Sequence, residues 1–102
     1  MPNFVSACSV SELPSGRGRT VSIQGVQVAL FNNQGTFHAC ANSCPHRGGP
    51  LAEGDFDGAT VTCPWHGFQF DVATGQAADG RAYRIPVYAT RVVDGKVEIA
   101  LA

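Results

Sequence analysis

Short apolar runs, several of them alternating with polar residues, recur along the chain between turns that contain glycine. The last run, residues 96–101, alternates with period two and places Val97, Ile99 and Leu101 on one face, as in a half-buried β-strand. Asp94-Gly95 precedes it, and an Asp-Gly pair between two such runs is typical of a β-hairpin. The pattern predicts an all-β fold. The expected strands are residues 4–8, 20–23, 26–31, 36–40, 60–63, 68–70, 85–93 and 96–101.

The alternation breaks down in the middle of the chain, over residues 41–59. Twelve glycines and six prolines argue against long helices, and residues 11–14 predict no more than a turn. Loops that a rigid scaffold holds in place commonly carry function. We therefore expect an insertion between β-elements, in or beside which the functional residues lie.

Length and charge restrict the class of protein. The 102 residues predict one small domain, residues 1–102, and 44% hydrophobic with 15% charged residues is a globular composition. The net charge of −1 gives no support for nucleic-acid binding or for an anionic membrane surface. Neither a signal peptide nor an apolar run of the roughly 20 residues that a membrane helix needs is apparent. We expect a cytoplasmic protein whose four cysteines are reduced, as ligands or buried thiols.

Two short segments each offer a thiol and an imidazole. The first ligand segment, Cys44-Pro-His-Arg-Gly-Gly, contains Cys44 and His46, and the second, Cys63-Pro-Trp-His-Gly-Phe, contains Cys63 and His66. Zinc accepts two cysteines and two histidines, but zinc fingers usually pair like with like. One ligand of each kind per segment instead suits a two-iron cluster, in which one iron takes both thiolates and the other takes both imidazoles. The prediction is a Rieske-type [2Fe–2S] cluster, with a structural zinc module as an alternative.

The flanks of both segments resemble those of the Rieske family. The motif C-x-H-x-G-x-x-L-x-x-G is matched by Cys44, His46, Gly48, Leu51 and Gly54. The motif C-P-x-H-G-x-x-F-D-x-x-T-G is matched by Cys63, Pro64, His66, Gly67, Phe70, Asp71, Thr74 and Gly75. The resemblance implies an antiparallel, β-sandwich-like base with an inserted cluster-binding subdomain over about residues 41–75. It also implies that His46 and His66 lie near the surface, where an electron can leave.

Departures from the high-potential branch of this family indicate the redox range. Members of that branch carry an extra cysteine in each segment, and the matching positions here are Gly49 and Trp65. They also place a serine and a tyrosine hydroxyl near the cluster, where this chain has Phe68 and Phe70. Hydrogen bonds to cluster sulfurs raise the potential, so their loss predicts the low end of the range, about −150 mV against an upper limit of about +300 mV.

The resemblance implies an electron carrier. A Rieske oxygenase needs a second iron, usually bound by two histidines and a carboxylate, and beyond the two predicted ligands only His38 remains. We therefore predict no catalytic site. The partners would be a ferredoxin reductase and a terminal oxygenase acting on aromatic substrates, and a monomer suits such a mobile carrier. The alternative is the small subunit of an assimilatory nitrite reductase, bound to its large subunit.

Several weaker signals concern the surroundings of the predicted cluster. Residues 51–79 hold five of the eight acidic residues and no lysine or arginine, which indicates either a docking surface for a basic partner or a solvated loop. Arg47 either contacts a partner or shifts the potential, or it is an ordinary exposed arginine of a loop. Trp65 either shields the cluster or belongs to a docking surface, or it packs as an ordinary apolar side chain. Cys8 and Cys40 are expected to be buried thiols. Asp71, Thr74 and Gly75 predict a turn. Aromatic side chains are expected beneath the ligand segments: Phe37, Phe56, Phe70 and Tyr83.

Overall fold

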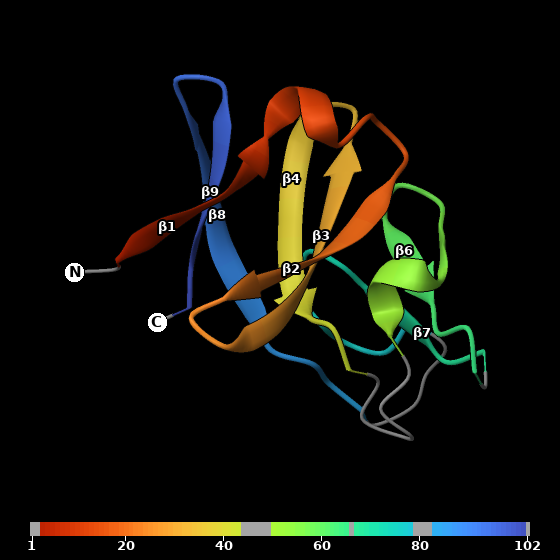
Figure 1. Ribbon diagram of the computed structural model, residues 1–102. Coiled ribbons are helices and arrows are strands. Elements are labelled where there is room, and N and C mark those ends of the chain that lie inside the picture. Colours follow the sequence, from red (N-terminus) through yellow and green to blue (C-terminus); the bar gives the residue numbers. More distant parts are fainter. Residues whose placement is uncertain (1–2, 44–49, 66, 79–82, 102) are drawn as a thin grey trace.

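The computed structural model describes residues 3–43, 50–65, 67–78 and 83–101 (Figure 1). Nearly all of its regular structure is β-strand, in agreement with the predicted fold class. Two single-turn 3₁₀ helices, η1 and η2, are the only helices among the described residues. In chain order the elements are β1 (Phe4–Ser9), η1 (Val10–Glu12), β2 (Gly18–Ile23), β3 (Val26–Asn33), β4 (Thr36–Ala41), η2 (Leu51–Glu53), β5 (Asp55–Phe56), β6 (Thr60–Thr62), β7 (Gln69–Asp71), β8 (Val87–Val93) and β9 (Lys96–Ala100).

Six strands form one antiparallel sheet in the order β1-β9-β8-β4-β3-β2. The sheet bends so strongly that its two edge strands, β1 and β2, come into contact, which gives the sandwich-like base (Figure 1). A bulge between Ser6 and Cys8 interrupts the pairing of β1 with β9, and bulges increase local bending of a strand. The inside of the bent sheet holds one core cluster. This base core contains Cys8, Leu13, Val21, Ile23, Val28, Leu30, Phe37, Ala39, Val97 and Ile99.

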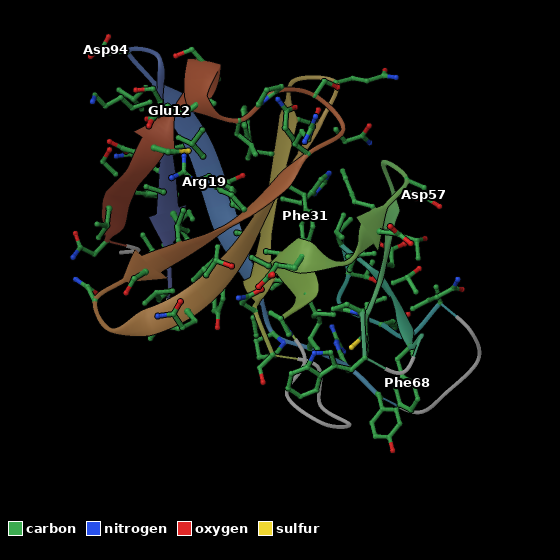
Figure 2. The ribbon with its side chains drawn as sticks, turned by 45° about the vertical axis from the view of Figure 1, so that its right-hand side comes forward. Glu12, Arg19, Phe31, Asp57, Phe68 and Asp94 are labelled. Carbon is green, nitrogen blue, oxygen red and sulfur yellow. The ribbon has the colours of Figure 1, made fainter. Side chains whose placement is uncertain are left out.

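A second, smaller antiparallel sheet, β5-β6-β7, lies beside β2 and β3 together with η2 (Figure 1). Alternate residues of β3 point to opposite sides, so Val28 and Leu30 enter the base core while Ala29 and Phe31 face the small sheet. The Phe31 ring lies 4.7 Å from the Phe56 ring, between centroids, and joins the two sheets (Figure 2). This second cluster, the site core, contains Ala29, Phe31, Cys40, Leu51, Ala52, Val61, Cys63, Phe68, Phe70, Val72 and Ile85.

All eight predicted strands are present, with ends that differ by one or two residues. The two-residue strand β5 and the helix η2 were not predicted, because two or three residues are too few to show a period. The expected turn at residues 11–14 overlaps η1. One packing prediction is wrong: Phe37 lies in the base core and not beneath the ligand segments, because it points to the opposite side of β4 from Cys40. No helix in the described part of the chain has the length and apolar character of a membrane span.

Candidate metal centre

Cys63 is the one predicted ligand that the structure describes. It directly follows β6, its exposed fraction is 2%, and its thiol forms no disulfide. Cys44, His46 and His66 lie outside the described residues, as do Gly48, Gly49 and Arg47. The described residues contain no group of three or more metal-binding side chains, and they include a single member of the predicted set.

Backbone hydrogen bonds hold Cys63 at the start of a tight hairpin between β6 and β7. Its N–H donates to the carbonyl of Phe68 over 2.7 Å, and the Gly67 N–H donates to the carbonyl of Cys63 over 3.1 Å. Gly67 has φ of +73°, a left-handed conformation that glycine adopts without a steric cost. A Cβ on Gly67 would meet no atom within 4 Å, so the backbone angle and not the available space calls for glycine.

The environment of Cys63 is apolar. Leu51, Val61 and Phe70 are fully buried in the same site core, and Phe68 is 6% exposed. The Phe68 ring lies 5.2 Å from that of Tyr83, whose side chain is 40% exposed (Figure 2 labels Phe68). Tyr83 therefore covers this core from outside, whereas Phe70 lies within it as predicted. A dry environment of this kind limits solvent access to a metal centre and tunes its potential.

The turn predicted after the second ligand segment is present. The Asp71 carboxylate accepts the N–H groups of Ala73 and Thr74 at 2.8 and 3.2 Å, and the Thr74 hydroxyl accepts that of Gln76. Gly75 has φ of +81°, and a Cβ there would collide with the Ile85 carbonyl oxygen. The Ile85 N–H donates to the Gly75 carbonyl at 2.8 Å, so this close approach ties the turn to the chain that leads into β8.

The two other described cysteines are buried thiols, as predicted. Cys40 is fully buried in the site core, and burial raises the pKa of its thiol to about 12. Cys8 lies in the base core, where burial also raises its pKa. Burial favours the protonated thiol in both cases, as expected for cysteines that pack in a core.

Exposed groups surround the small sheet. Glu53, Asp55 and Asp57 are exposed, and Trp65 is 57% exposed, so the indole does not serve as a core packing residue. The Asp57 carboxylate accepts the N–H groups of Ala59 and Thr60, which lowers its pKa.

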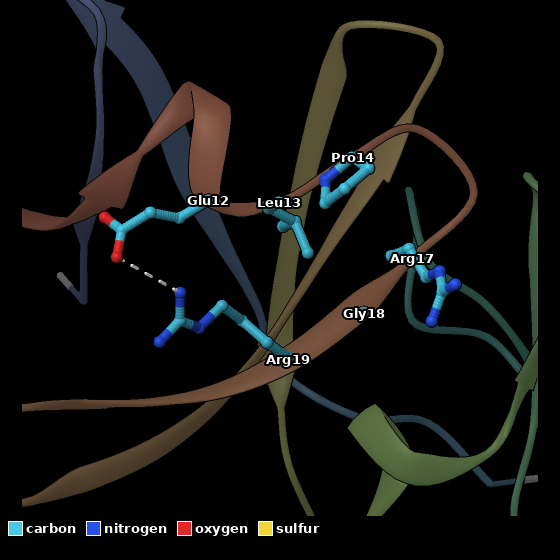
Figure 3. Close-up of a pocket in the computed structure, with 6 residues that line it drawn as sticks. All are labelled: Glu12, Leu13, Pro14, Arg17, Gly18 and Arg19. Atoms are coloured by element: carbon cyan, nitrogen blue, oxygen red, sulfur yellow. Dashed lines mark ion pairs between the residues drawn. The ribbon is translucent and has the colours of Figure 1, made fainter.

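A separate cavity of about 340 Å³ lies at η1 and the start of β2. Figure 3 shows Glu12 and Arg19 facing each other across it, with Arg19 Nη1 3.8 Å from Glu12 Oε2, while Arg17 points elsewhere. The cavity borders Leu13 of the base core, and Cys63, the predicted ligand that the structure describes, does not line it.

Comparison with known proteins identifies the family. The family model of the Rieske [2Fe–2S] domain matches residues 3–89. The chain belongs to the Rieske [2Fe–2S] family. It is 42% identical over 74 residues to the biphenyl dioxygenase ferredoxin subunit of Pseudomonas sp. (strain KKS102), covering 72% of this chain and 68% of that protein.

Solved Rieske structures share the fold. The ferredoxin of Sphingomonas yanoikuyae B1 aligns with a TM-score of 0.88 and 31% identity over 98% of this chain and all of that one. A putative NADH-dependent nitrite reductase small subunit from Mycobacterium tuberculosis aligns with a TM-score of 0.89 and 31% identity, over 100% of this chain and 97% of that one. The human apoptosis-inducing factor 3 is 39% identical over 74 residues, 72% of this chain, but the match spans only 12% of that protein's length.

The described part of this Rieske domain fits a [2Fe–2S] cluster. Cys63 offers a soft sulfur ligand, free of a disulfide and enclosed by apolar side chains. The second motif places Gly67, Phe70, Asp71, Thr74 and Gly75 in one hairpin and its following turn.

Proposed function

We propose that this Rieske domain carries single electrons from a ferredoxin reductase to a terminal oxygenase, such as an aromatic-ring-hydroxylating dioxygenase. The cluster would be held by Cys44, His46, Cys63 and His66. The similarity to the biphenyl dioxygenase ferredoxin subunit over most of both chains carries the proposal. The buried, unpaired Cys63 at the end of β6 supports it from the geometry.

The residues around Cys63 have separable roles in this function. A bound Rieske cluster supplies one-electron chemistry. Phe68 and Phe70 exclude water from the thiolate side, and their side chains offer no hydroxyl to it. The hairpin bonds of Cys63 and Gly67 fix the direction in which the sulfur points. The exposed Trp65 and the acidic groups near η2 and β5 provide surface for a partner.

We further propose that residues 1–102 form one domain, with a cluster-binding subdomain over about residues 41–75, in a monomeric, cytoplasmic protein. The carrier would have no catalytic site of its own. Relatives that are named as ferredoxin components support a non-catalytic role.

A second candidate function is that of the small subunit of a nitrite reductase. The match to the Mycobacterium tuberculosis protein over the whole of this chain favours it. In that case the acceptor would be a large subunit and the complex would be permanent. A structural zinc module, the third possibility, conflicts with the family to which the chain belongs.

Analysis of iron, zinc and acid-labile sulfide, with EPR of the dithionite-reduced protein, tests the cluster. The expected result is iron and sulfide in equal amounts and a rhombic Rieske signal; zinc without sulfide would overturn the proposal. Stopped-flow reduction and reoxidation then tests the partner. A ferredoxin acts on a separately purified dioxygenase at substoichiometric amounts, whereas a nitrite reductase subunit would co-purify with its large subunit in a fixed ratio.

A further inference from the structure

Asn42 is the hub of three hydrogen bonds at the end of β4. Its side-chain Nδ2 donates to the Thr20 hydroxyl over 3.0 Å, and its Oδ1 accepts the Ala52 N–H over 2.8 Å. Its own N–H donates to the Gln27 carbonyl over 3.2 Å. One side chain thus links β4, β2 and η2.

The bond to Ala52 compensates for a missing helix cap. The first N–H groups of a helix have no partner inside it and need an acceptor from elsewhere. Pro50, at the N-cap position of η2, offers no side-chain acceptor. Ala52 is 8% exposed and packs in the site core, so its N–H is shielded from water. Asn42 Oδ1 therefore acts as a remote cap for η2.

The bond between Asn42 and Ala52 also joins two parts of the chain on either side of the first ligand segment. Asn42 and Ala52 flank residues 44–49, which include two of the four predicted ligands. On one side, Ala41 is fixed by its N–H bond to the Pro86 carbonyl. On the other side, Leu51 is fully buried in the core that also holds Cys63. The Asn42–Ala52 bond holds these two sides together.

We propose that Asn42 is a positioning residue for the cluster: it sets where Cys44 and His46 stand relative to Cys63. The inference rests on the proposed function, because it concerns the same cluster. Without the bond, the chain on either side of the first ligand segment would separate more easily and release its ligands. In this role Asn42 acts through the backbone of η2, because its Oδ1 accepts the Ala52 N–H.

The test uses the cluster-loaded protein with Asn42→Ala, and Asn32→Ala as matched control. Asn32 also makes two side-chain hydrogen bonds, to the Leu13 carbonyl and from the Gly35 N–H, both at 2.7 Å, but at the turn between β3 and β4. The measurement is the decay of visible cluster absorbance in excess EDTA without denaturant, together with the EPR g-values. Residues that orient metal ligands from outside the ligand set change affinity by about 10- to 100-fold, so we expect N42A to lose its cluster about 10-fold faster or more.

Three outcomes distinguish positioning from general stability. N32A should lower the unfolding midpoint yet keep the wild-type decay rate and g-values. Asn42→Asp retains the acceptor for Ala52 and should restore a decay rate close to wild type. Wild-type decay and g-values in N42A, or an equal change in N32A, would overturn the role of Asn42. If N42A yields no folded protein, Asn42→Gln, with its longer amide, carries the same test and the same expected direction. A wild-type protein without iron and sulfide would instead overturn the proposed function, before any variant is compared.

Discussion

The two halves of the candidate centre are held by different means. Around the second ligand segment, Cys63 and Gly67 are fixed by the backbone bonds of a β-hairpin, and the Asp71 turn follows directly. Around the first, the described flanks are joined by the side chain of Asn42. The hairpin holds Cys63 through backbone hydrogen bonds, with glycine required at position 67, whereas the link between the flanks of the first segment depends on one side chain. The backbone of the hairpin therefore positions the second ligand segment, whereas the flanks of the first ligand segment are joined through the side chain of Asn42.

The strongest way to break this comparison is to remove the thiol of the second half. Cys63→Ser should abolish the cluster and its visible spectrum, because the proposed cluster would be held through this thiolate and metal binding is commonly coupled to folding. Cys40→Ala is the matched control, since Cys40 is buried in the same core but has a thiol pKa of about 12. It should keep the full content of iron and sulfide. Full absorbance in C63S, or its loss in C40A, would contradict the assignment of Cys63.

The glycines that end the two motifs offer a second comparison. A Cβ on Gly54 would collide with the Thr62 carbonyl oxygen, and one on Gly75 with that of Ile85. Only Gly75 also has a left-handed φ, which costs other residues about 1–2 kcal/mol. Gly75→Ala should therefore lower the free energy of unfolding more than Gly54→Ala, by about that amount. Urea midpoints of the two loaded variants measure the difference, and equal midpoints would mean that the collisions dominate.

Much of the fold could be predicted because its strands alternate. β9 and β2 carry enough alternating residues to fix their faces, and the buried Val21, Ile23 and Val97 follow that pattern. The alternation of side chains along β4 also places Phe37 on the face opposite to that of His38 and Cys40, which agrees with its position in the base core. In contrast, β5 and η2 depend on tertiary contacts that no local pattern reveals.

The chemistry of the site could be predicted from residue types, but its support could not. A cysteine and a histidine in each segment indicate the cluster without any structure. Asn42 lies two residues before Cys44 and has no periodic or motif signal of its own. Its role depends on Thr20 and Ala52 being brought beside it by the packing of β2 and η2.

The apolar side chains around Cys63 predict a low redox potential for the cluster, because they donate no hydrogen bond to its sulfur atoms. Phe70→Tyr would place a hydroxyl in the core that holds Cys63, at one of the two positions that the family resemblance matches to hydroxyl-bearing residues of the high-potential branch. A hydrogen bond to a charged acceptor is worth about 1.5 kcal/mol, and for one electron a tenfold change corresponds to 59 mV, so we expect a rise of about 60 mV. Phe37→Tyr, in the base core, is the control and should leave the potential unchanged. Voltammetry measures both; a wild-type midpoint well above zero would contradict the low-potential prediction.

The smallest expected effect concerns the acidic residues of the small sheet and its turns, whose carboxylates differ in their hydrogen-bond partners. The Asp57 and Asp71 carboxylates accept backbone N–H groups within turns, whereas the carboxylate of Asp55 has no hydrogen-bond or ion-pair partner among the described residues. A carboxylate that is free for a partner should act through long-range attraction, which salt screens. Asp55→Asn should therefore slow electron transfer to a basic partner by about two- to threefold at low ionic strength, and the difference should vanish at high salt.

Asp94→Asn is the matched control for this prediction. It removes the same charge from the turn between β8 and β9, which lies far from Asp57 and the small sheet (Figure 2). Asn also tolerates the left-handed φ of +51° at that position, so the fold should be unaffected. If stopped-flow rates fall equally in D55N and D94N, net charge alone steers the partner. Rates that do not depend on ionic strength in either variant would assign the acidic residues to solvation, and docking would then rest on the exposed Trp65.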